Sequence, residues 1–377
     1  MANIHAGNSS ATNLDHQHLD HQHLDHQLSA YSYNLPEERI AQNPVTPRDH
    51  SKLLVVDTAQ THHQRFYNLV DWLSPNDLLV INNTKVIPAR LYGHKASGAA
   101  VEVLLIEPVP EKGSDRWLVL VRPGKRIQPG IEILFGDQSN PLMSALVESR
   151  DEATGGRVVQ LVPRVDQPID VLIDRLGQMP LPPYITESES LPEQYQTVYA
   201  RKRGAIAAPT AGLHFTQSLF DKLSAKGIQT AEVTLHVGIG TFRPVEVTDI
   251  ETHEMHQERI EVSAATVEQI KQTKAKGGRV IAVGTTSTRA LEGAAAIYGE
   301  LQSYIGKTDL FIYPGYQWQV IDGMITNFHL PGSSLLMMIS AMIGRERLLA
   351  IYEDAITKEY RFYSFGDAML ILPAAKI

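Results

Sequence analysis

Residues 279–289 read Arg-Val-Ile-Ala-Val-Gly-Thr-Thr-Ser-Thr-Arg, and this stretch decides the fold class. Four consecutive apolar residues closed by a glycine are typical of a strand that is buried on both faces. The hydroxyl-rich turn that follows supplies N-cap residues, so we expect a helix over 288–298. A strand that leads into a helix in this way is the building unit of an α/β domain.

The same alternation continues on both sides of this segment. Apolar runs predict further strands, and amphipathic stretches that begin at serine or end at glycine predict helices. The expected strands are 52–57, 77–81, 229–236, 310–313 and 324–328, and the expected helices are 218–226, 264–276, 333–343 and 345–356. We therefore expect an α/β fold with a mostly parallel mixed sheet and flanking helices.

The pattern changes between residues 88 and 163. Short apolar runs follow one another there, separated by turn dipeptides such as Pro123-Gly124 and Gly155-Gly156. Regular short strands with such turns are typical of a small antiparallel β-barrel. We expect this β-barrel domain over 88–163, inserted into an α/β domain made of residues 31–87 and 164–377.

Residues 1–30 form a polar tail in which Asp-His-Gln-His-Leu occurs at 15–19 and 20–24 and, shortened, at 25–28. Histidine and aspartate also bind metals. A short polar segment, however, buries too little surface to offset its ordering entropy. We interpret 1–30 as a disordered tail.

Composition excludes several classes of protein. The 377 residues contain no cysteine, so thiolate metal sites and thiol nucleophiles are ruled out. The net charge of −8 means that a nucleic-acid partner would have to meet a local basic patch. We see no signal peptide, and the apolar run 335–343 is shorter than the ~20 residues that span a bilayer. We expect a cytoplasmic protein without membrane contact.

Three histidines lie in loops next to expected strands and helices. His236 ends a strand, His329 follows another, and His214 lies in a Pro- and Gly-bearing loop before a helix. A single histidine at such a place is more often structural than catalytic. Three at equivalent places indicate a shared pocket, because ligands of open α/β sheets bind beyond the carboxyl ends of the strands.

The turn that begins at Gly284 is expected to bind an anion. Free backbone N–H groups at a helix start attract negative charge. The hydroxyl groups of Thr285, Thr286 and Ser287 add donors, and Arg289 adds a guanidinium that matches a carboxylate or phosphate. The spacing fits neither a P-loop nor a dinucleotide-binding motif, and simple helix capping explains it equally well.

Basic residues gather in two clusters that could follow the phosphates of a nucleic acid or simply form solvated turns. One cluster, in the expected barrel, is Arg122, Lys125 and Arg126, and the other is Arg201, Lys202 and Arg203.

Several longer segments, taken together, resemble the S-adenosylmethionine:tRNA ribosyltransferase-isomerase family of queuosine synthesis. These segments are 46–49, 82–90, 208–216, 234–242, 284–289 and 326–334. They occur in one order from residue 31 to the C-terminus. The resemblance implies an α/β catalytic domain with an inserted β-barrel, and S-adenosylmethionine as a consumed co-substrate rather than a true cofactor. It implies no metal. The implied acceptor is 7-aminomethyl-7-deazaguanine at the wobble position of a tRNA, and the implied products are epoxyqueuosine-tRNA, adenine and methionine.

The implied reaction assigns roles to residues. It needs a base for a ribose proton, an acceptor for the amine proton and an acid for adenine, and histidine suits all three near neutral pH. We expect His214, His236 and His329 to be catalytic, without apportioning the three roles. Expected substrate-binding residues are Arg48, Asp49, Lys85, Arg90, Thr210, Gly212, Gly238, Gly240, Thr241, Gly284, Thr285, Thr286, Ser287, Arg289, Asn327 and Ser333. We expect the two basic clusters to bind tRNA and the protein to be a monomer.

Three other functions compete with this interpretation. A methyltransferase would share the co-substrate, but its glycine-rich loop after the first strand is missing. The base-exchanging transglycosylase of the same pathway carries a cysteine-rich zinc site, which a chain without cysteine cannot form. A non-catalytic RNA-binding protein would not need so many histidine- and glycine-bearing loops.

Overall fold

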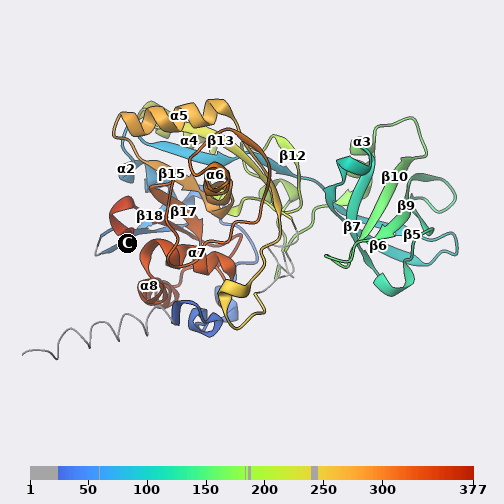
Figure 1. Cartoon of the computed structure of the whole chain (residues 1–377), viewed down its shortest axis with the longest axis horizontal. Helices are drawn as coiled ribbons and strands as arrows, with labels where there is room; N and C mark the ends of the chain where they lie inside the picture. The colour runs from blue at the N-terminus through green and yellow to red at the C-terminus, as the bar shows by residue number, and fades with distance from the viewer. Residues whose placement is uncertain (1–23, 59, 183, 186–187, 239–244) are drawn as a thin grey trace, which may run out of the picture.

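The computed structural model describes residues 24–58, 60–182, 184–185, 188–238 and 245–377. Figure 1 shows a large sheet with helices on both faces and, to its right, a small body that contains the barrel strands and helix α3. The α/β class with an inserted antiparallel barrel is confirmed. In the part of the chain described, no helix is long and apolar enough to cross a membrane.

The large sheet has nine strands in the order β16-β14-β13-β3-β15-β17-β18-β1-β2. Parallel pairs join β13, β3, β15 and β17 in the centre, and β18 to β1. The other neighbouring pairs are antiparallel. The strands are β1 (Lys52–Val56), β2 (Thr61–Arg65), β3 (Leu78–Asn82), β13 (Gln229–His236), β14 (Glu258–Val262), β15 (Val280–Val283), β16 (Tyr304–Thr308), β17 (Gly323–Asn327) and β18 (Ala368–Ile371).

The sheet is therefore mixed, as expected, but the expectation that it is mostly parallel is wrong. The sequence pattern predicts none of β2, β14, β16 and β18, and each antiparallel pair contains one of these strands. Strands β2, β14 and β16 lie at or beside an edge and carry charged residues instead of a continuous apolar run. Residues 310–313 do not form the expected strand. Their apolar pattern reflects packing instead, because Ile312 is buried in the core cluster beside the helices.

Helices cover both faces of the sheet because alternate side chains of each strand point to opposite faces. On β1, Leu54 and Val56 face the cluster that holds α6, α7 and α8, while Leu53 and Val55 face the cluster that holds α2 and α4. The helices are α2 (Leu69–Trp72), α4 (Gln217–Ala225), α5 (Ala264–Ala275), α6 (Gly284–Tyr298), α7 (Ser334–Ile343) and α8 (Arg345–Thr357). Helix α6 starts directly where β15 ends, earlier than the expected start at residue 288.

The barrel closes through six antiparallel strands, with β5 pairing to β8. Gly93 permits this closure, because a Cβ there would lie 2.6 Å from the carbonyl oxygen of Leu134. The strands are β5 (Arg90–His94), β6 (Ala100–Pro108), β7 (Arg116–Arg122), β8 (Glu132–Gly136), β9 (Pro141–Arg150) and β10 (Arg157–Pro163). Helix α3 (Ile169–Leu176) adds Leu172 and Ile173 to the barrel core, and β11 (Gly177–Gln178) pairs with β5. We propose that the barrel domain spans residues 88–163.

Two short strands lie between the barrel and the large sheet. Strand β4 (Thr84–Val86) follows β3, and β12 (Lys202–Ala205) pairs with it in parallel. This pairing places residues 202–205 next to the end of β13, where predicted site residues lie.

Residues 24–30 are ordered, which corrects our placement of them in a disordered tail. Asp25 pairs with Arg345 at 2.7 Å, and the backbone N–H of Leu28 donates to Thr248 at 3.0 Å. Tyr31, which follows, is fully buried and donates to the carbonyl of Asp25. These contacts offset the ordering entropy that a free polar segment could not. The first two repeats, apart from Leu24, lie outside the described residues.

Candidate functional site

A cavity of about 330 Å³ lies at the carboxyl ends of β15 and β17, where α6 and α7 begin, and we call it the α6–α7 cavity. Open α/β sheets bind their ligands at this place. The predicted residues that line it are Thr210, Gly284, Thr285, Thr286, Asn327, His329 and Ser333. Tyr184, Tyr195, Tyr363 and Ser364, which the sequence did not single out, also line it. The cavity thus joins four of the segments that carry the resemblance: 208–216, 234–242, 284–289 and 326–334.

Polar groups of the α6–α7 cavity are only partly satisfied by the protein. Thr210 donates to the side-chain oxygen of Asn327 at 2.9 Å. The buried Thr286 hydroxyl oxygen has no hydrogen-bond partner in the described part of the chain. A buried polar group without a partner is uncommon in folded proteins. Beside it, the first N–H groups of α6 have no partner within their own helix.

His329 lies half-buried in the wall of this cavity. Its Nε2 is 2.7 Å from the hydroxyl of Thr326, and its backbone N–H donates to Tyr352. Burial lowers the pKa of His329 to about 3, so the ring is neutral at pH 7. Among the residues described, none bonds to its Nδ1, which leaves this atom for a ligand.

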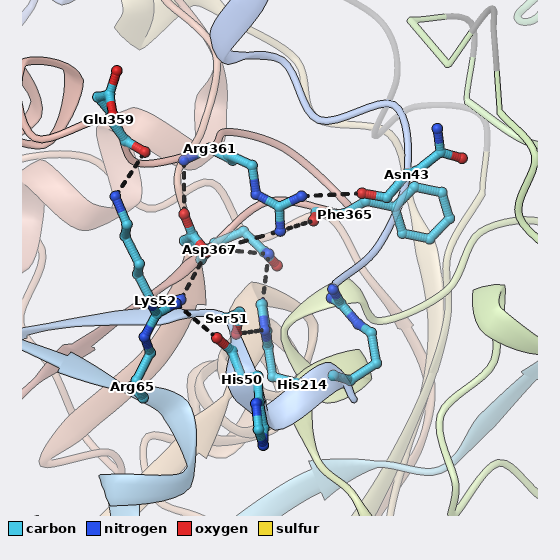
Figure 2. Close-up of polar contacts among 12 residues, drawn as sticks. Asn43, His50, Ser51, Lys52, Arg65, His214, Glu359, Arg361, Phe365 and Asp367 are labelled. Atoms are coloured by element: carbon cyan, nitrogen blue, oxygen red, sulfur yellow. Dashed lines mark hydrogen bonds and ion pairs between the residues drawn. The ribbon is translucent and has the colours of Figure 1, made fainter. Parts of the chain in front are cut away.

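His214 lies behind the cavity rather than in it. Its Nδ1 is 2.7 Å from the hydroxyl of Ser51, as Figure 2 shows, and its Nε2 is 3.1 Å from the amide nitrogen of Asn327. The ring stacks on Phe66 at 4.9 Å and is fully buried. Burial first, and then the charges of Arg48 and Arg361, holds the pKa of His214 well below its usual value. With both nitrogens engaged, His214 positions Asn327.

A second cavity, of about 540 Å³, lies between the barrel and the large sheet, and we call it the barrel-side cavity. Barrel residues from Ile106 to Glu111 form one side of it, and residues 255–259 form another. His236 and Gly238 line it at the end of β13, and its charged lining is mixed: Arg203, Arg259 and Lys307 stand beside Glu107, Glu111, Asp151 and Glu258. The sequence did not predict this cavity, because its walls come from segments far apart along the chain.

His236 is held tightly at the wall of the barrel-side cavity. Its Nδ1 is 2.7 Å from the hydroxyl of Thr84. Gly204, at φ +144°, lies flat against the ring, and a Cβ there would meet three ring atoms at 3.0–3.1 Å. Burial, followed by the charges of Arg259 and Lys202, lowers the pKa of His236 to about 4. Within the described residues nothing bonds to its Nε2.

The two cavities adjoin along the segment 236–238. His236 and Gly238 line the barrel-side cavity, whereas Val237 between them lines the α6–α7 cavity. Alternate residues of an extended chain point to opposite sides. The backbone N–H of Ile206 donates to Val237 at 3.2 Å and fixes the segment. The three predicted histidines therefore do not share one pocket, and the expectation of a shared pocket is wrong.

Other predicted residues lie away from both cavities. Ser287 donates to the carbonyl of Val283 at 2.8 Å, which ties its hydroxyl to its own helix. Arg289 forms a buried ion pair with Glu258. Arg90 forms an ion pair with Glu102 on the barrel.

Three further predicted residues make structural contacts near His214 and the start of α4. Arg48 donates to the carbonyl of Leu213 at 3.2 Å, and burial lowers the pKa of Arg48 to about 10. Asp49 accepts from the hydroxyl of Thr216, the N-cap of α4, at 2.7 Å. Gly212 makes room for Tyr199, whose hydroxyl would lie 2.0 Å from a Cβ at that position.

Of the remaining predicted residues, Lys85 lies on β4 and lines neither cavity, while Gly240 and Thr241 lie outside the described residues. Thr84 was missed even though it belongs to segment 82–90, which carried the resemblance.

The two basic clusters differ in their surroundings. Arg201, Lys202 and Arg203 pair with Glu232, Glu261 and Asp174 respectively. The barrel cluster of Arg122, Lys125 and Arg126 makes no ion pair with any residue in the described ranges. Over those ranges we also find no group of three or more His, Asp or Glu side chains placed to hold a metal ion.

Comparison with known proteins gives a consistent result. A family model described as "Queuosine biosynthesis protein" matches residues 28–371. S-adenosylmethionine:tRNA ribosyltransferase-isomerase from Nostoc sp. is 59% identical, over 93% of this chain and 92% of that protein. The enzyme of the same name from Synechococcus elongatus is 60% identical, over 93% and 97%. The crystal structure of S-adenosylmethionine tRNA ribosyltransferase from Thermotoga maritima matches with a TM-score of 0.52 and 39% identity, covering 91% of this chain and all of that one.

Proposed function

The chain belongs to the queuosine biosynthesis family of S-adenosylmethionine:tRNA ribosyltransferase-isomerases, and we propose that it transfers and isomerises the ribosyl group of S-adenosylmethionine onto a tRNA base. The proposed acceptor is 7-aminomethyl-7-deazaguanine at the wobble position, and the products are epoxyqueuosine-tRNA, adenine and methionine. S-adenosylmethionine is consumed as a co-substrate. A tRNA substrate leads us to expect the protein in the cytoplasm.

We place S-adenosylmethionine in the α6–α7 cavity. The start of α6 at Gly284 suits the methionine carboxylate, as does the hydroxyl of Thr286, which has no partner among the residues described. Tyr184 and Tyr363, whose ring centroids lie 4.2 Å apart, offer aromatic faces to the sulfonium or to adenine. The neutral His329 is then the group beside this substrate that can take a proton from ribose and, once protonated in this way, deliver that proton to adenine.

We place the acceptor base in the barrel-side cavity, which is the larger of the two and is lined by both basic and acidic side chains that can bind the polar edges of a base. An amine must be neutral to attack, and a neutral histidine can take its proton. His236 fits this role because Thr84 orients its ring and Nε2 has no partner among the described groups. His214 acts through Asn327 and touches neither substrate.

One observation carries the proposal. Two cavities adjoin along a single three-residue segment, and each has a half-buried neutral histidine in its wall. Such a pair suits a reaction between two large substrates better than it suits a binding module, which needs one surface and no proton acceptors.

The direct test follows small molecules during turnover. The protein is incubated with S-adenosylmethionine and tRNA that carries the aminomethyl-deazaguanine base. We expect adenine and methionine to be released in step with a gain in tRNA mass. Release of S-adenosylhomocysteine would instead show a methyltransferase. Binding of tRNA by a folded sample without any release would show a binding module.

A further inference from the structure

An ion pair between Glu258 and Arg289 lies buried beside the two cavities. Their side chains are only 3% and 5% exposed. Glu258 is the first residue of β14, and Arg289 lies on α6, so the pair joins the sheet to the helix. The other oxygen of the Glu258 carboxylate accepts from the backbone N–H of Gly238 at 3.3 Å. Arg289 also donates to the carbonyl of Leu310 at 3.3 Å.

The two residues of this pair lie on elements that line the two cavities. Glu258 and Gly238 line the barrel-side cavity directly. Arg289 lies on the helix whose first residues, Gly284 to Thr286, line the α6–α7 cavity. The start of α6 is therefore linked to the segment 236–238 through the helix up to Arg289, the ion pair with Glu258 and the hydrogen bond from Gly238.

The physical character of the pair favours a positioning role over a stabilising one. Removing two charges from water is unfavourable, and a buried ion pair regains this free energy only in part. Its geometry, however, is strongly fixed, because a displaced partner would leave a buried charge uncompensated. One Arg289 nitrogen, Nη2, is buried without a hydrogen-bond partner in the described ranges, so the pair is not arranged for maximal stability.

We propose that Glu258 and Arg289 are positioning residues that set the segment 236–238 relative to the start of α6, so that filling one cavity tightens binding in the other. This inference rests on the proposed function, since it takes S-adenosylmethionine and tRNA as the two ligands. Binding at the start of α6 biases the position of Arg289, and through Glu258 it fixes Gly238 and the neighbouring His236.

The test measures coupling rather than activity alone. The dissociation constant of S-adenosylmethionine is determined with and without saturating acceptor tRNA, for the wild type, Glu258→Gln and Arg289→Lys. Couplings between two sites are typically about 5- to 150-fold. We expect a coupling in this range for the wild type and less than about twofold for Glu258→Gln. Affinity for S-adenosylmethionine without tRNA should change by less than about threefold, since neither residue lines its cavity.

A matched control is the ion pair between Asp77 and Arg279, which joins the residues just before β3 and β15 and lines neither cavity. Asp77→Asn should lower the melting temperature and leave the coupling unchanged. If the single variants at 258 or 289 do not fold, the double variant Glu258→Met/Arg289→Met removes both charges together and avoids an unpaired buried charge.

The inference is overturned if the wild type shows no coupling, or if folded variants of the pair keep the wild-type coupling. Failure of the proposed function looks different, because then the wild type would release no adenine with any tRNA.

Discussion

The α6–α7 cavity and the barrel-side cavity adjoin each other, yet the chain builds them in different ways. The first is made of contiguous segments in which a strand ends and a helix begins, such as 284–286 and 326–334. The second is assembled from barrel strands, from Gly204 and from the start of β14. A cavity of the first kind depends on local backbone geometry, whereas one of the second kind depends on how distant parts of the chain pack. Substitutions should therefore affect the two cavities in distinguishable ways.

The largest effect is expected at the histidine of the barrel-side cavity. His236→Ala removes the proposed proton acceptor, and general-base catalysis contributes about 10²- to 10⁴-fold. We expect the single-turnover rate of ribosyl transfer to fall by that factor, with an unchanged dissociation constant for S-adenosylmethionine. His62→Ala is a matched control, since His62 packs on Trp72 away from both cavities. A rate near that of the wild type would remove His236 from the mechanism.

The pH dependence sharpens the same prediction. Burial lowers the pKa of His236 to about 4, so the ring stays neutral through the physiological range. The rate should not depend on this group above pH 5 and should fall as the pH approaches 4. The folded protein also binds fewer protons at His236 than the unfolded chain between about pH 4 and 6.5, where the unfolded histidine titrates. Stability from this group is thus present above pH 6.5 and lost as the pH falls, which chemical denaturation at several pH values would detect.

A second substitution should disturb the barrel-side cavity and leave the α6–α7 cavity intact. Gly204→Ala places a Cβ 3.0–3.1 Å from three ring atoms of His236. The ring must turn away from Thr84, and we expect the rate to fall by about 100-fold with unchanged affinity for S-adenosylmethionine. Gly299→Ala also carries a positive φ, of +75°, but meets nothing within 4 Å, so it isolates backbone strain. Equal rates for the two variants would contradict the proposed role of the ring position.

The contrast between the cavities also explains what the sequence could predict. Segment 284–289 is a strand end followed by a helix start, a local pattern that places Gly284, Thr285 and Thr286 in a cavity. The same pattern could not show that Ser287 would turn back to the carbonyl of Val283. Local spacing fixes which residues follow a strand, but side-chain direction depends on the rotamer and on the packed surroundings.

The error over the histidines has a similar cause. His214 and Asn327 meet through tertiary packing, although 113 positions separate them along the chain. Whether His236 or Val237 faces a given cavity depends on strand alternation and on what covers each face of β13. The barrel could be predicted from its turns, while the strands β14 and β16 at and beside the sheet edge could not, because charged residues interrupt their apolar pattern.

A third prediction tests the α6–α7 cavity alone. Thr286→Val removes the buried hydroxyl that has no protein partner in the part described. A hydrogen bond to a charged ligand contributes about 1.5–3 kcal/mol, so affinity for S-adenosylmethionine should fall by at least about tenfold. Ser287→Ala is the matched control, because that hydroxyl already donates to Val283. Equal affinities in calorimetric titrations would place the ligand elsewhere.

The smallest effect is expected at the two basic clusters. The barrel cluster has no carboxylate partner in the described ranges, while each residue from 201 to 203 has one. Replacing Lys125 and Arg126 by Gln should weaken tRNA binding about threefold. It should also lower the log–log salt dependence of the dissociation constant by about one unit for each phosphate that is no longer neutralised. Replacing Arg201 and Lys202 by Gln should change that slope less, because their charge is already neutralised locally. A larger change at 201 and 202 would mean that tRNA displaces Glu232 and Glu261 on binding, and would move the RNA path from the barrel to β12.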